Sequence, residues 1–280
     1  MAPVRVACCQ VHLTIGDVPG NRGRVRRAVA AAAEAGARIV VVPELANSGY
    51  VFADAAEAMS MAEPVDGPTV SGWIDLARRL DLVLVGGFCE RDPDGRLRNS
   101  AVVVDATGVR ALYRKVHLWD REKLVFVPGD AAPPVVDTAY GQIAAVICYD
   151  LEFAEWIRLP ALRGAQLLCA PVNWPDLPRP DGERPSEVVR VQAVAATNRM
   201  FVAVADRIGE ERGVDWVGGT VLVDPDGWPI GGLALGRATT VLADLDLDTA
   251  RDKRLSERND VHADRRPELY APIYRTEENV

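Results

Sequence analysis

The chain has 280 residues, 49% of them hydrophobic, and a formal net charge of −8. This length can supply one large α/β domain with a substantial core. The acidic balance argues against nucleic acid and anionic membranes as partners. No apolar run approaches the roughly 20 residues that a membrane span needs, and residues 1–11 lack the long apolar core of a signal peptide. We therefore expect a cytoplasmic protein.

Strand and helix patterns alternate along the first half of the chain. Residues 38–42 form a β-branched run, typical of a strand buried on both faces. The helix before it carries alanines on one side and arginines on the other. The predicted elements are strands at 4–11, 38–42, 82–88, 99–105 and 109–113, and helices at 22–35 and 66–80.

The second half repeats this layout without a sequence repeat. Its predicted elements are strands at 142–147, 165–170, 200–205, 217–223 and 240–245, and helices at 153–163 and 186–199. We expect the last two strands to pair across the turn at 225–227. The layout favours two sheets packed together with helices outside. No linker divides the chain, which predicts a single domain over residues 1–280.

The five cysteines and three histidines point to neither a disulfide framework nor a metal site. The number of cysteines is odd, and no export signal accompanies them. No Cys/His cluster has metal-ligand spacing, and no glycine-rich motif has the pattern of a nucleotide site. We therefore expect no metal and no organic cofactor.

Three chemically reactive side chains stand at the ends of predicted strands. They are Glu44, Lys115 and Cys148. Singly, each has an ordinary interpretation: a solvated glutamate, an exposed lysine and a small buried hydrophobe. Together they form a consistent set, because a thiol needs a base, a buried carboxylate can be that base, and a lysine can stabilise an oxyanion. Strand ends are also where α/β folds build sites.

Four ordered motifs carry a resemblance to a known family. They are VVVPELANSGY around Glu44, YRKVHL around Lys115, E-x-x-x-F-x-P-G from Glu122 to Gly129, and ICYDLEF around Cys148. With them, the chain resembles the nitrilase (carbon–nitrogen hydrolase) superfamily over nearly its whole length. The resemblance implies an α/β fold, a four-layer αββα sandwich, commonly dimerised. The tail at 265–280, too polar for a core of its own, would pack at an oligomer interface.

The resemblance also implies a role for each motif residue. Cys148 would be the nucleophile, Glu44 the general base and Lys115 the oxyanion stabiliser. Glu122 would orient the substrate or support Lys115, and the backbone N–H of Tyr149 would share the oxyanion hole. The expected reaction is hydrolysis of a small amide to an acid and ammonia through a thioester.

Residues after the cysteine bear on the substrate. Tyr149-Asp150 resembles amidase-type and Nit-like members, whereas nitrilases proper usually have Trp-Glu. Many Nit-like members have an arginine where this chain has Glu152, so the reversed charge argues against a dicarboxylate monoamide. This reversed charge, together with the acidic loop at 209–215, leads to the hypothesis that the substrate is a neutral or amine-bearing amide. The alternative is that Glu152 only pairs with Arg158 or another arginine.

Other candidates and other readings stay open at this stage. Asn173 and Trp174 lie in a loop where the family places substrate contacts. A nitrilase or an N-carbamoyl amide hydrolase is an alternative activity, and transfer of the acyl group to an acceptor other than water is another. A papain-like protease would need His117 as the partner of Cys148. A catalytically silent scaffold protein on the same fold is the alternative from another class.

Overall fold

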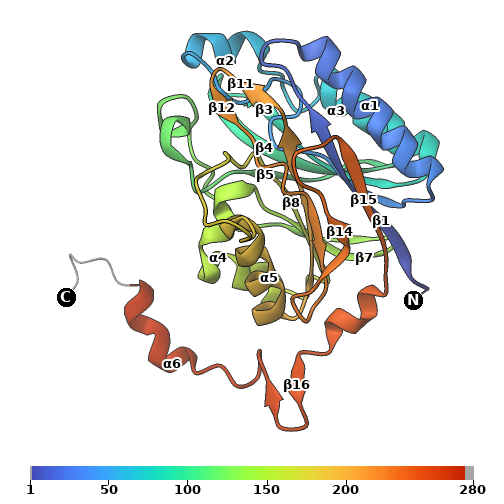
Figure 1. Cartoon of the computed structure of the whole chain (residues 1–280), viewed down its shortest axis with the longest axis vertical. Coiled ribbons are helices and arrows are strands. Elements are labelled where there is room, and N and C mark those ends of the chain that lie inside the picture. Colours follow the sequence, from blue (N-terminus) through green and yellow to red (C-terminus); the bar gives the residue numbers. More distant parts are fainter. Residues whose placement is uncertain (1, 275–280) are drawn as a thin grey trace.

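Two mixed β-sheets pack face to face in the computed structural model, which describes residues 2–274, and two helices cover the outer face of each sheet (Figure 1). The first sheet has the order β10-β1-β2-β3-β4-β5, with β15 antiparallel to β1. Its strands are β1 (Val4–His12), β2 (Ile39–Val41), β3 (Val83–Arg91), β4 (Leu97–Asp105), β5 (Gly108–Arg114), β10 (Arg207–Ile208) and β15 (Thr239–Leu245).

The second sheet has the order β14-β13-β9-β8-β7-β6, with β7, β8 and β9 parallel at its centre. Its strands are β6 (Val135–Thr138), β7 (Gly141–Ala145), β8 (Leu167–Pro171), β9 (Phe201–Ala205), β13 (Val221–Val223) and β14 (Pro229–Leu233). Two short hairpins lie outside both sheets, β11 (Glu210–Glu211) with β12 (Val214–Asp215) and β16 (Arg254–Ser256) with β17 (Asn259–Asp260).

The helices form the two outer layers. Helices α1 (Val18–Glu34) and α3 (Pro68–Leu80) pack on the first sheet, and α4 (Ala154–Leu162) and α5 (Ser186–Asn198) on the second. Two shorter helices are α2 (Ala55–Met61) and α6 (Pro267–Tyr270). Within residues 2–274, every helix is too short or too polar to span a bilayer.

The alternation of side chains along β1 shows how the layers form. Val6 and Cys8 face the second sheet and join Leu167 and Ala203 in the core between the sheets. Ala7 and Cys9 point the other way, into the core beneath α1 and α3. A strand apolar on both faces therefore serves two cores at once. The predicted four-layer αββα sandwich is confirmed.

Two local predictions were wrong. β15 does not pair with β13 but crosses to the first sheet, because β14 lies immediately after the turn at 225–227 and takes the place beside β13. Helix α1 begins at Val18 instead of residue 22. Asp17 accepts a hydrogen bond from the N–H of Gly20, and a proline is tolerated in the first turn, where its missing N–H costs nothing.

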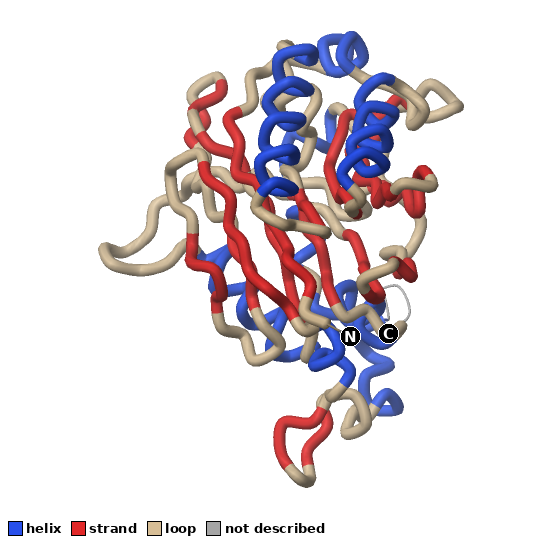
Figure 2. Tube along the Cα trace, turned by 90° about the vertical axis from the view of Figure 1, so that its right-hand side faces the viewer, coloured by secondary structure: helices blue, strands red, loops and turns tan. Residues whose placement is uncertain are grey.

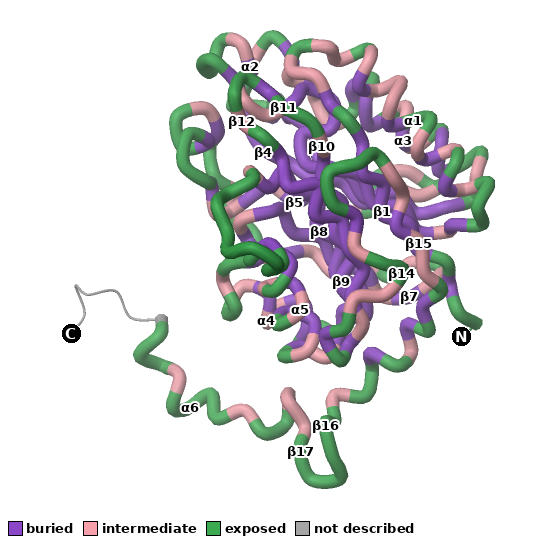
Figure 3. Tube along the Cα trace, in the orientation of Figure 1, coloured by how far each residue is buried: buried purple, intermediate pink, exposed green. Residues whose placement is uncertain are grey.

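The segment after Asp252 leaves the body of the molecule. Figures 1 and 2 show the β16–β17 hairpin and α6 standing apart from both sheets, and Figure 3 shows most of this segment as exposed. We call residues 252–274 the C-terminal arm. It exposes three large apolar side chains, Leu255, Leu269 and Ile273, each by more than 60%. Residues 275–280 of the predicted interface tail lie outside the described residues.

Candidate active site

The topology brings the predicted residues to one edge of the two sheets. Glu44 follows β2, Lys115 follows β5 and Cys148 follows β7, each at the carboxyl end of its strand. The first two come from one sheet and the third from the other, so the site forms only when the sheets pack. Glu44 and Lys115 are fully buried, and Cys148 is 8% exposed.

Lys115 lies between two carboxylates. Its Nζ donates to Glu44 Oε1 and to Glu122 Oε1, both at 2.8 Å. Asn99 Nδ2 donates to the same two oxygens, at 2.7 and 3.3 Å. Burial raises the pKa of Glu44 to about 7, although the charge of Lys115 opposes the shift. Burial lowers the pKa of Lys115, but the carboxylates of Glu122 and Glu44 outweigh it and the pKa stays above its usual value.

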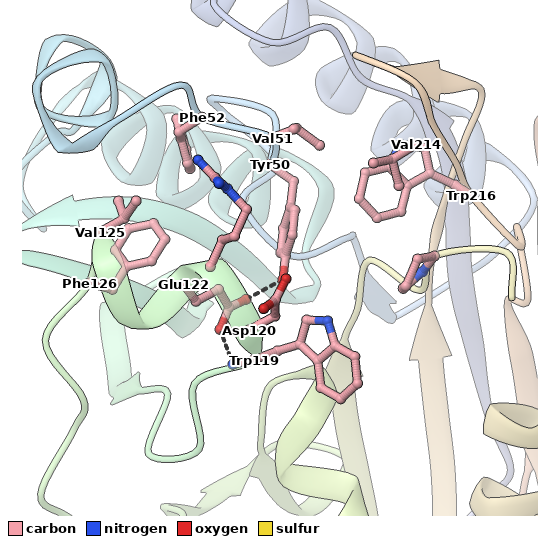
Figure 4. A pocket seen from close by; sticks show the side chains of 12 residues that line it. Tyr50, Val51, Phe52, Trp119, Asp120, Glu122, Val125, Phe126, Val214 and Trp216 are labelled. Carbon is pink, nitrogen blue, oxygen red and sulfur yellow. Dashed lines mark hydrogen bonds between the residues drawn. The ribbon is translucent and has the colours of Figure 1, made fainter.

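Glu122 is held by four donors. Besides Lys115 and Asn99, the hydroxyl of Tyr50 donates to its Oε1 at 2.7 Å and the N–H of Trp119 donates to its Oε2 at 2.9 Å (Figure 4). A buried carboxylate with this many donors is fixed in place. It can therefore keep Lys115 protonated and oriented.

Cys148 opens a 3₁₀ turn (Cys148–Glu152) between β7 and α4, which begins at Ala154. Its backbone has φ of 47°, a left-handed conformation that costs a non-glycine residue energy. The thiol donates to the carbonyl of Asn173 at 3.8 Å. Burial and the charge of Glu44 raise the pKa of Cys148, while Lys115 lowers it.

Asp150 fixes this turn. It accepts hydrogen bonds from the hydroxyl of Tyr113 at 2.7 Å and from the N–H of Ile147 at 3.0 Å. The Nδ1 of His117 lies 2.7 Å from the other oxygen, and the His117 ring stacks on Phe153 at 3.8 Å. The structure thus pairs His117 with Asp150, which removes the support for a papain-like dyad with Cys148.

The backbone of Glu44 passes close to β3. A Cβ at Gly87 would lie 2.6 Å from the Cα of Glu44, so only glycine fits this crossing. On the other side, Asn173 Nδ2 donates to the carbonyl of Glu44 at 3.0 Å. Asn173 therefore holds both the Glu44 backbone and, through its own carbonyl, the thiol of Cys148.

A small cavity of about 40 Å³ opens onto the thiol. The four predicted substrate contacts all line it: Tyr149, Glu152, Asn173 and Trp174. A second cavity of about 180 Å³ adjoins it and shares Trp119 and Pro175 with the first. Figure 4 shows this second cavity, with Tyr50, Trp119 and Trp216 around it.

Glu152 pairs with an arginine, as the alternative reading held, but the partner is Arg190 and not Arg158. Arg190 Nε lies 2.8 Å from Glu152 Oε2, whereas Arg158 donates to the carbonyl of Thr197. The acidic loop at 209–215 does not reach the cavity of Cys148. Its Glu211 is buried and accepts from the N–H groups of Tyr50 and Val51.

Several residues of this site were missed from the sequence: Tyr50, Asn99, Trp119, Glu187 and Arg190. Tyr50 is the last residue of the motif around Glu44, so the motif could have identified it as a site residue. Asn99 reaches the site through tertiary contacts, and Arg190 opens a run, residues 190–199, that fits the family pattern without revealing its contact with Glu152. Among residues 2–274, no group of three or more His, Cys, Asp or Glu side chains is placed to hold a metal ion.

Known proteins resemble the chain over nearly its whole length. A family model described as carbon-nitrogen hydrolase matches residues 5–255. A protein named nitrilase from Pyrococcus abyssi is 34% identical over 95% of this chain and 99% of its own length. An N-carbamoylputrescine amidase from Solanum lycopersicum is 33% identical over 95% of this chain and 93% of its own.

Solved structures agree with the sequence comparison. The crystal structure of an amidase from Nesterenkonia sp. matches with a TM-score of 0.80 at 29% identity, over 97% of each chain. A mutant of that amidase carries acrylamide added to its active-site cysteine. Its structure matches with a TM-score of 0.79 at 29% identity, over 96% of this chain and 99% of that one.

Proposed function

Because the chain belongs to the carbon–nitrogen hydrolase family and is of the amidase type, we propose that Cys148 is its nucleophile, with Glu44 as base and Lys115 as oxyanion stabiliser. The observation that carries this assignment is the buried contact of Lys115 with Glu44 and Glu122 beside the only thiol that opens onto the cavity within residues 2–274. Structural ion pairs of this kind add little stability over apolar packing, so a catalytic use explains their burial.

In the first half-reaction, Glu44 takes the thiol proton and the sulfur of Cys148 forms a bond to the amide carbon. The carbonyl electrons move to the oxygen, where Lys115 and the N–H of Tyr149 stabilise the negative charge. The C–N bond then breaks as Glu44 returns the proton to the amide nitrogen. Ammonia departs, and the acyl group stays on Cys148 as a thioester. A pKa near 7 lets Glu44 both accept and return a proton at neutral pH.

In the second half-reaction, Glu44 takes a proton from water and the oxygen attacks the thioester carbon. Lys115 stabilises the same oxyanion again. The C–S bond breaks, Cys148 regains its proton and the acid is released. Glu122 acts through Lys115, which it holds in place at 2.8 Å. Glu44, Lys115 and Cys148 titrate as a group.

Amides are the proposed substrates over nitriles and N-carbamoyl amides. Tyr149-Asp150 after the nucleophile supports this choice, as do the amidases among the similar proteins, including an (R)-stereoselective amidase from Pseudomonas sp. that is 33% identical over 76% of this chain and 74% of its own. The relative named for N-carbamoylputrescine makes the N-carbamoyl class the second candidate. Assaying ammonia release from a panel of all three classes, with Cys148→Ala as control, separates them.

We also propose that residues 1–280 form one domain and that the protein is a homodimer or a higher homo-oligomer. The exposed Leu269 and Ile273 of the C-terminal arm support an oligomer, because large apolar side chains on a projecting segment are usually covered by a partner. The cytoplasmic location stays a prediction from the sequence.

A further inference from the structure

Three charged side chains line the same cavity as Cys148. Glu152 comes from the 3₁₀ turn after the nucleophile, and Glu187 and Arg190 come from α5. The side chains of Arg190 and Glu152 are 29% and 35% exposed, whereas Cys148 is 8% exposed. The charges therefore stand at the solvent end of the cavity and the thiol at its inner end. We call Glu152, Glu187 and Arg190 the charged rim.

The charges of the rim do not cancel. Arg190 Nε lies 2.8 Å from Glu152 Oε2, which neutralises one carboxylate. Glu187 lies one helical turn before Arg190, and within residues 2–274 its carboxylate has neither a hydrogen bond nor an ion pair. Its charge also raises the pKa of Glu152. One negative charge thus remains unpaired at the rim.

A second observation indicates a ligand in this cavity. Asn173, which lines it and is 1% exposed, has a side-chain oxygen without a hydrogen-bond partner in the described chain. Glu44 Oε2 is buried and unpartnered in the same way. Buried acceptors are rarely left unsatisfied, so the Asn173 oxygen that lines the cavity can accept from a donor such as an N–H group of a substrate amide. The amide end of a ligand then lies deep, and its other end points to the rim.

We propose that the charged rim recognises an ammonium group at the far end of the substrate, so that the preferred amide carries a primary amine on a short aliphatic chain. This inference rests on the proposed amide hydrolysis. Glu187 supplies the free carboxylate, and Arg190 holds Glu152 beside it. Trp119, Trp174 and Leu177 line the same cavity and give apolar surface for the methylene chain.

A carboxylate-bearing substrate fits the rim less well. To pair with Arg190 it would have to share the guanidinium with Glu152. It would then place a third carboxylate beside Glu152 and Glu187 with one guanidinium to share among them. An ammonium group meets no such competition, because Glu187 is unpaired. The sign of the charge at the rim therefore selects cationic over anionic substrates.

The test compares three amides of one chain length: δ-aminovaleramide, its neutral isostere hexanamide and the anionic adipamate. We expect kcat/KM to fall in that order. In Glu187→Gln, the ratio of kcat/KM for δ-aminovaleramide to that for hexanamide should fall about fivefold, the size of a partly exposed charge contact. Glu183→Gln removes the same charge from an exposed loop outside the cavity, so its ratio should equal that of the wild type. An unchanged ratio in Glu187→Gln, or a preference for adipamate, overturns the proposal.

Binding to Cys148→Ala, measured by calorimetry, separates this proposal from the proposed function. The rim is intact in this variant, so the dissociation constants should follow the same order of charge. If the wild type hydrolyses none of the amides, the proposed function fails. The order of the dissociation constants in Cys148→Ala then still shows whether the rim prefers an ammonium group. Equal affinities of Cys148→Ala for δ-aminovaleramide and hexanamide would contradict recognition of the ammonium group by the rim, even if the wild type hydrolysed both amides.

Discussion

Lys115 Nζ and Glu44 Oε1 lie 2.8 Å apart, and neither side chain is exposed to solvent. Taking two such charges out of water costs several kcal/mol per ion, which their attraction offsets only in part. The pair is nevertheless held by Asn99 and Glu122, so the fold maintains it in a defined geometry. Burial outweighs the charge of Lys115 and raises the pKa of Glu44 to about 7, so this carboxyl group changes protonation near neutral pH.

The pH dependence of activity follows from the burial of Glu44. Because burial raises the pKa of Glu44 to about 7, the base is protonated below that pH, and kcat/KM should fall as the pH drops from 8 to 6. Asp206 provides a control, since burial also raises its pKa to about 7 while it accepts from the N–H groups of Trp174 and Gly219. The acidic limb should remain in Asp206→Asn. Its disappearance there, or a limb only below pH 5, would contradict the assignment to Glu44.

Tyr50→Phe tests the support of Glu122. The variant removes the hydroxyl that donates to Glu122 Oε1 at 2.7 Å, one of four donors to this carboxylate. The net value of such a bond to a charged group is about 1.5 kcal/mol, so we expect kcat to fall about tenfold with little change in KM. Steady-state kinetics measures both. Tyr140→Phe, which removes a remote bond to the carbonyl of Asp81, should match the wild type. A kcat unaffected in Tyr50→Phe would speak against this support.

Gly87→Ala tests the close crossing of β3 and the Glu44 backbone. The added Cβ would lie 2.6 Å from the Cα of Glu44, so the chain must shift at the base itself. We expect a loss of about 1–3 kcal/mol in the free energy of unfolding and a fall in kcat of at least about 100-fold. Gly72→Ala is the matched control, since a Cβ there meets nothing within 4 Å. Denaturant unfolding and kinetics on both variants decide, and a fully active Gly87→Ala would refute the geometry.

The double variant Leu269→Asp with Ile273→Asp tests the C-terminal arm. Both side chains are more than 60% exposed, and charges on them would have to be buried at a partner surface. Light scattering coupled to size exclusion should show a smaller assembly than that of the wild type. Leu269→Met with Ile273→Val keeps the apolar area and should leave the mass unchanged. The same mass in all three proteins would place the interface elsewhere.

Much of the site could be predicted because its main residues follow strands directly. Glu44 and Cys148 follow buried apolar runs, Lys115 follows β5, and these strands bring their carboxyl ends to one edge. The charged rim could not be found this way. Glu152 and Arg190 are 38 residues apart and meet only because α5 packs beside the turn after the nucleophile.

The wrong strand pairing has a similar cause. The residues of β15 are typical of a strand, but they do not identify its partner. β14 lies next to the turn and pairs with β13, so β15 is left to the edge of β1 in the other sheet. Local pattern identifies a strand, whereas competition between strands sets its neighbour.

The nucleophile itself is tested most directly by trapping the thioester. The wild type and Glu44→Gln are mixed with the best amide of the panel, quenched in acid, digested and examined by mass spectrometry. We expect an acyl group on the peptide that contains Cys148 in the wild type, and slow or absent formation of this group in Glu44→Gln. Steady hydrolysis with no acyl group on Cys148, or with the group on another residue, would contradict it.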